Sequence, residues 1–188
     1  MTIAVKSCLD VVFRLSDLAL NDREYIQPQK LHRLLYLAQA YYAVAYDGRK
    51  LMPATFVTDS FGPVEPTVFH LFAYGRPHMI EPHPLSAQAS HFLDSIWRRF
   101  GVLSADKLTA KVADHPPVAL AMAKGINVEI TFAEMVAFYT AEAATRKAGS
   151  RVDPLEQVVR PRVMRSQSGK PVSVVSWKPK TVPAPKKD

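Results

Sequence analysis

The sequence contains very little cysteine. Cys8 is the single cysteine among 188 residues, which excludes an intramolecular disulfide and a disulfide-stabilised scaffold. No neighbouring motif activates this thiol, so we expect Cys8 to be a small buried hydrophobic residue. Long hydrophobic runs are missing too. The longest stretch without Asp, Glu, Lys or Arg, residues 34–46, has 13 residues and is too short to cross a bilayer. We expect no signal peptide and a cytoplasmic protein.

Glycine is also scarce, and its pattern excludes several classes of enzyme. The seven glycines are scattered and form neither a phosphate-binding loop nor a nucleophile elbow. The six histidines do not stand at metal-ligand spacings such as HExxH, and no CxxC pair exists. We therefore expect no catalytic residue, no metal ion and no cofactor, and a binding protein in place of an enzyme.

The positive charge is confined to the C-terminal part of the chain. Residues 1–149 hold 15 basic and 14 acidic residues, a net charge of +1, whereas residues 150–188 hold 9 basic and 3 acidic residues, a net charge of +6. The same 39 residues contain six of the fifteen prolines. This pattern predicts a compact domain over residues 1–149 and a basic, Pro-rich, disordered tail over residues 150–188.

Hydrophobic periodicity within the first 149 residues predicts an α-dominated fold, mainly α with a small β hairpin or short extended segments. Caps and breakers place its helices at residues 5–19, 28–46, 66–74, 86–100, 104–113, 118–124 and 131–147. Extended segments are expected near residues 55–58 and 128–130, with a turn at residues 61–63. A further segment with strand character, residues 171–177, has no sheet of its own and needs a partner edge.

Aromatic residues crowd the second predicted helix. Tyr36, Tyr41, Tyr42 and Tyr46 all lie on it, and Tyr41 and Tyr42 point about 100° apart, so both cannot face one core squarely. Two interpretations remain open, namely core packing or a partly exposed aromatic face that anchors a protein partner.

Two short motifs on this helix and after it carry a resemblance to a known family. Residues 30–40, KLHRLLYLAQA, resemble the pattern K-L-x-K-L-L-Y-x-A-Q-A, and residues 61–64, FGPV, resemble an aromatic-G-P-V turn. Val68, Phe69 and the Tyr74-Gly75 pair match the short helix and stop that follow. In this order and at this separation, over residues 5–147, the motifs are similar to those of the Panacea domain of bacterial and phage antitoxins, which includes SocA-type antitoxins. One departure is Asp59, where the family commonly carries an aromatic residue.

The resemblance implies an antitoxin that neutralises a cognate protein toxin by direct binding. For one branch it also implies an adaptor that delivers the toxin to an AAA+ protease such as ClpXP. The candidate partner-binding or motif residues are Tyr36, Gln39, Tyr42, Phe61, Gly62, Pro63, Val64, Phe69 and Tyr74.

The tail offers a second set of candidate contacts with a toxin, a protease or nucleic acid. These are Val174, Trp177, Lys178 and Lys180. A nucleic-acid-binding regulator that uses the basic tail and an enzyme of unrecognised type are the alternative hypotheses. No helix-turn-helix spacing with a basic second helix supports the first of these. A tail that only improves solubility is a further possibility.

Overall fold

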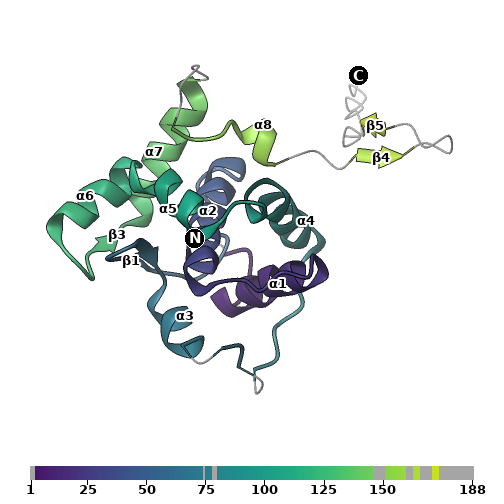
Figure 1. Cartoon of the computed structure of the whole chain (residues 1–188). Helices are drawn as coiled ribbons and strands as arrows, with labels where there is room; N and C mark the ends of the chain where they lie inside the picture. The colour runs from purple at the N-terminus through teal and green to yellow at the C-terminus, as the bar shows by residue number, and fades with distance from the viewer. Residues whose placement is uncertain are drawn as a thin grey trace, which may run out of the picture.

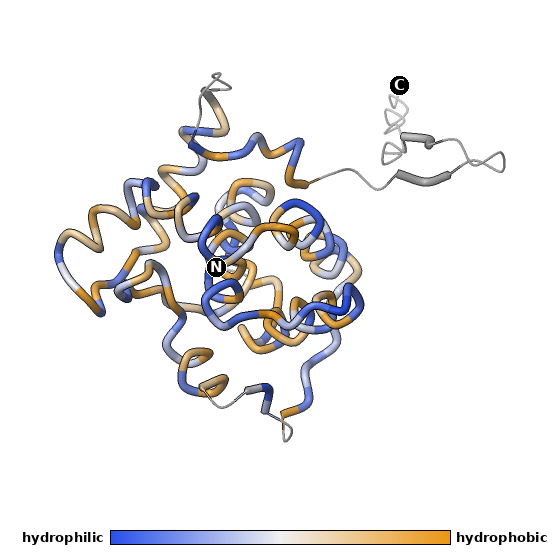
Figure 2. Tube along the Cα trace, viewed as in Figure 1, coloured by the Kyte–Doolittle hydropathy of each residue, from blue (hydrophilic) through white to orange (hydrophobic). Residues whose placement is uncertain are grey.

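The computed structural model describes residues 3–73, 75–77, 80–145, 151–159, 163–165 and 171–173. In this part of the chain, helices dominate and the β structure is a small three-stranded sheet and a short hairpin, which confirms the expected fold class (Figure 1). Along the helices, hydrophobic and hydrophilic stretches alternate (Figure 2). No helix in the described residues has the length and apolar character needed to cross a membrane.

The first helix begins at Cys8, three residues after the expected start at residue 5, because Ser7 caps it, and the second begins at Pro28 as expected. Helix α1, Cys8–Asn21, starts after Ser7, whose hydroxyl accepts from the Leu9 amide while Asp10 accepts from the Ser7 amide, forming a capping box. Helix α2, Pro28–Ala45, has its proline in the first turn, where no intrahelical donor is lost. The chain leaves α2 through Asp47 and Gly48, both with positive φ (51° and 77°). Cys8 is buried as expected.

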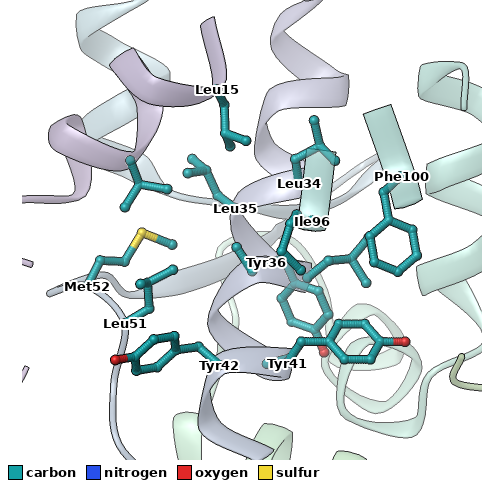
Figure 3. Close-up of a cluster of buried hydrophobic side chains, with 14 of the residues drawn as sticks. Leu15, Leu34, Leu35, Tyr36, Tyr41, Tyr42, Leu51, Met52, Ile96 and Phe100 are labelled. Carbon is teal, nitrogen blue, oxygen red and sulfur yellow. The ribbon is translucent and has the colours of Figure 1, made fainter. Parts of the chain in front are cut away.

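Helix α2 is the centre of the body and is buried on every side. It packs against α1, α4, α5, α7 and the sheet. Tyr41 and Tyr42 therefore both lie in the core, with 2% and 1% of their surface exposed, because their rings meet different neighbours. Tyr41 packs against Phe100 and Tyr42 against Phe92, and the two rings point in opposite directions (Figure 3). The interpretation of these tyrosines as an exposed partner-binding face is wrong.

The sheet combines a tight hairpin with a short third strand. Strands β1, Phe56–Asp59, and β2, Gly62–Val64, pair antiparallel through a two-residue turn, and β3, Glu129–Ile130, pairs with the other edge of β1. The turn is thus at residues 60–61, earlier than the expected 61–63, because Gly62 and Pro63 already belong to the ladder. Phe56 points inward, where its ring meets Tyr36 edge to face.

The remaining helices surround α2 and the sheet. They are α3 (Pro66–Leu71), α4 (Ala87–Ile96), which continues as the π-helical turn η1 (Trp97–Gly101), α5 (Ala105–Ala113), α6 (Pro116–Lys124) and α7 (Phe132–Thr145). Ser86 and Ser104 cap α4 and α5, and Thr131 with Glu134 forms the expected capping box of α7. Two details differ from expectation. Helix α3 ends at Leu71, before the expected end at residue 74. Pro116 and Pro117 open α6 instead of preceding it, because the first helical turn tolerates proline.

The body extends beyond the expected boundary at Gly149. Residues 151–159, with helix α8 (Leu155–Val158), pack onto it, and Val152 and Val158 join the hydrophobic core at 5% and 1% exposure. The carboxylate of Asp153 pairs with Arg99 and Lys111, each at 3.1 Å. Residues 151–159 therefore belong to the packed body, through contacts that composition does not reveal.

A second, isolated hairpin lies in the tail. Strand β5, Pro171–Ser173, pairs antiparallel with β4, Val163–Arg165, so the tail itself supplies the partner edge that this segment needs. The candidate tail contacts Val174, Trp177, Lys178 and Lys180 lie outside the described residues, as does Tyr74.

Candidate protein-binding surface

The hairpin β1–β2 and the short helix α3 form one surface, which we call the hairpin–α3 surface (residues 57–70). Two consecutive residues of the central helix α2, His32 and Arg33, reach this surface from below. Phe61 at the hairpin tip and Phe69 on α3 are 55% and 51% exposed. Both are among the candidate partner-binding residues, and they are the exposed members of that set within the described residues.

Arg33 holds the hairpin from inside the protein. Its side chain is only 1% exposed, and its guanidinium donates to the carbonyl oxygens of Pro63, at 2.6 Å, and Phe61. Its Nε donates to Thr109 Oγ1 on α5, at 3.3 Å. Burial lowers the pKa of Arg33 to about 10, while the nearby Asp59 opposes that shift, so the side chain is charged at neutral pH. The guanidinium of Arg33 thus connects α2 to the hairpin and to α5 through three hydrogen bonds.

Gly62 gives the hairpin its shape above Arg33. Its φ of +120° lies in a region that residues with a side chain rarely adopt. A Cβ at this position would lie 3.4 Å from the Arg33 guanidinium, which is an ordinary contact, so the requirement for glycine is conformational. The turn at residues 60–61 then projects Phe61 away from the body.

His32 fixes the start of α3, as Arg33 fixes the hairpin. Its Nδ1 accepts from the Glu65 amide at 3.3 Å, and the Glu65 carboxylate accepts from the Val68 amide at 2.7 Å, capping α3. Burial is the main cause that lowers the pKa of His32 to about 4, so the ring is neutral and able to accept at neutral pH. Its ring also lies 6.2 Å from the ring of Phe69. The backbone segments that carry Phe61 and Phe69 are therefore held in place by two buried side chains of α2.

The other candidate residues in the described part of the chain are buried. Tyr36 is buried in the core. Gln39 is 1% exposed. Its side-chain Nε2 donates to the backbone carbonyl of Met52 at 3.2 Å, and its Oε1 accepts from the backbone N–H of Met52 at 3.1 Å. Pro63 and Val64 belong to the buried strand β2. Tyr36, Gln39 and Pro63 therefore build the fold, whereas Val64 also lines a hollow on the surface beside α3.

Sequence reasoning missed that several charged residues are buried, Lys30 in the body and Glu65 at the start of α3. Lys30 is 4% exposed and donates to the Gly101 carbonyl at 2.5 Å and to Glu24, while its ammonium lies 5.3 Å from the Trp97 ring centroid. Glu65 is likewise 4% exposed. The available signal was their place at the start of a helix that is otherwise apolar, because a charge in such a position needs buried partners.

Comparisons with known proteins add no identification, since the chain matches no protein-family model, no curated protein and no solved structure. Among the described residues, no group of three or more His, Cys, Asp or Glu side chains is arranged to hold a metal ion. What the geometry offers is a rigid surface with two exposed aromatic rings, and such rings are the side chains that most often dominate protein–protein interfaces.

Proposed function

We propose that the protein is a cytoplasmic antitoxin that binds and neutralises a protein toxin through the hairpin–α3 surface. One observation carries the proposal. The two motifs behind the Panacea resemblance meet beneath this surface, where Arg33 of the first motif donates to the carbonyl oxygens of Phe61 and Pro63 in the second. That arrangement presents Phe61 and Phe69 in fixed positions, which reduces the entropy lost on binding.

Growth rescue tests this function. Each reading frame that flanks the gene is expressed from an inducible promoter, alone and together with this protein. The proposal expects one frame to arrest growth, co-expression to restore growth, and the two products to copurify. If no flanking frame is toxic, or if rescue occurs without a complex, the proposal of direct neutralisation is wrong.

A matched pair of double variants tests the surface. Phe61→Asp with Phe69→Asp places charge at the proposed contact and should abolish rescue. The control is Val102→Asp with Leu120→Asp, because these side chains are at least as exposed, at 82% and 61%, and lie elsewhere on the protein. The control should rescue normally. Equal loss of rescue in both pairs would show that a general effect on solubility is responsible.

Delivery of the toxin to a protease is a separable part of the proposal and concerns the tail. Because residues 151–159 pack on the body, a fair test removes only residues 160–188. This deletion should leave toxin affinity within about tenfold, or ~1.4 kcal/mol, and should stop toxin degradation in cells. Loss of toxin binding itself would place part of the toxin interface in the tail.

A further inference from the structure

The outer face of the sheet carries a row of side chains beside α3. Val57 on β1 lies opposite Val64 on β2 and opposite Glu129 on β3. Directly opposed residues of antiparallel strands project on the same face, so these three side chains form one row across the sheet. Asp59, two residues after Val57, projects on that face as well.

A shallow hollow of about 290 Å³ opens between this face and α3. Valine side chains and Phe69 make its surface largely apolar, and Asp59 stands within it. Its lining includes Val57, Asp59, Val64, Pro66, Phe69 and His70. The hollow is therefore large enough for one side chain of a partner and offers that side chain apolar contact.

Two carboxylates, those of Asp59 and Glu129, lie on this face, and the imidazole of His70 is the basic group among the described residues that line the hollow. Neither Asp59 nor Glu129 forms an ion pair with any described residue, and none of the described Lys or Arg residues lines the hollow. Arg33 interacts electrostatically with Asp59, but it is buried beneath the hairpin and directs its donors to the carbonyls of Phe61 and Pro63. The surface thus combines an apolar hollow with two carboxylates that an incoming cation can reach.

From this arrangement we infer that the hollow receives a basic segment of the partner protein. An aliphatic or aromatic side chain of that segment fills the hollow against Val57 and Val64, and neighbouring Lys or Arg side chains pair with Asp59 and Glu129. Nucleic acid or an acidic segment would be repelled by the same carboxylates. The inference rests on the proposed function only in taking the toxin as the source of the segment.

Two matched peptides test the chemistry without the toxin. One is KKLFLKK and the other is EELFLEE, each titrated into the ¹⁵N-labelled full chain at millimolar concentration. The inference expects the lysine peptide, and not the glutamate peptide, to shift amide signals of residues 57–70 and 127–130. Equal or larger shifts at these residues with the glutamate peptide would overturn it.

Charge variants of the full chain complete the test. Asp59→Asn with Glu129→Lys should weaken the lysine peptide at this surface by about tenfold or more. Glu129→Lys alone, which leaves the carboxylate near Arg33 in place, should weaken it by a smaller factor. The control, Glu81→Lys with Asp114→Lys, reverses two exposed carboxylates elsewhere and should have no effect. Unchanged binding in the first two variants would overturn the inference.

The growth assay separates this inference from the proposed function. If the variant Asp59→Asn with Glu129→Lys rescues growth as well as the unaltered chain while Phe61→Asp with Phe69→Asp does not, the function stands and the basic-segment inference is wrong. If the lysine peptide binds as expected but no flanking frame is toxic, the hollow is a basic-segment site of a protein with another function.

Discussion

Replacement of Arg33 by methionine tests whether a buried cation holds the binding surface in place. Methionine keeps an unbranched apolar side chain of similar length but removes the three donor groups. In this variant the Pro63 carbonyl loses its donor inside the protein, because its hydrogen bond to Arg33 is fully buried. The Phe61 carbonyl is only partly buried, so water can replace the lost donor there. A buried carbonyl without a partner destabilises a fold by about 1–3 kcal/mol.

The net effect is a balance of opposing contributions. Loss of the bonds to Pro63, Phe61 and Thr109 destabilises the fold, while removal of a charge that is only 1% exposed recovers part of its desolvation penalty. We expect a net loss of about 2–4 kcal/mol in the free energy of unfolding. Arg33→Lys should have an intermediate effect, since an ammonium keeps the charge but cannot reproduce the planar guanidinium geometry.

Urea unfolding followed by circular dichroism measures the loss, and amide hydrogen exchange locates it. The exchange of residues 57–64 should accelerate more than that of the α1 core. The control is Arg98→Met, because Arg98 also donates to a backbone carbonyl, that of Asp94 at 3.2 Å, but on the protein surface. That change should stay within ~0.5 kcal/mol. If Arg33→Met also stays within this range and leaves hairpin exchange unchanged, Arg33 does not hold the surface.

Three further outcomes follow from the structure. A chain ending at Gly149 should be less stable than one ending at Val159 by about 3–5 kcal/mol, because two buried valines and their neighbours are removed; thermal unfolding of both chains measures this. Stability should fall as the pH drops from 6.5 to about 4, by up to ~3 kcal/mol for each of His32 and His115, since both are neutral when folded and bind protons first in the unfolded chain. Urea titrations across this pH range, with His115→Gln expected to flatten the slope, check the sign. Gly62→Ala should cost about 1–3 kcal/mol from its positive φ, and a wild-type midpoint in urea would refute the need for glycine.

Local signals in the sequence predicted most element starts. Ser86, Ser104 and the pair Thr131 and Glu134 cap helices at the expected positions, because a capping side chain acts within three residues of the helix start. The strand near residues 55–58 also followed from short-range chemistry, whereas its partner strand lies where a turn was expected. Gly62 was identified from its neighbours alone, since a glycine before proline in a turn suggests an unusual φ.

Features that depend on distant contacts could not be predicted in this way. Whether Tyr42 is buried depends on α4, fifty residues later, which supplies Phe92. The ordering of residues 151–159 depends on Arg99, Lys111 and Tyr41, whose hydroxyl donates to the Asp153 carbonyl at 3.1 Å. A proline and a charge-rich composition favour a loop locally, and tertiary packing overrides that preference.

The same distinction explains what the motif on α2 contributes to function. Lys30, His32 and Arg33 are each less than 5% exposed and bond to the π-turn, α3 and the hairpin. They are buried away from any partner, yet His32 and Arg33 fix the backbone that carries Phe69 and Phe61. The motif therefore specifies a support, whereas Asp59 and Glu129, which lie outside it, carry the charge that selects a partner. Two proteins with this motif and different residues at these two positions should present the same platform to partners of different charge.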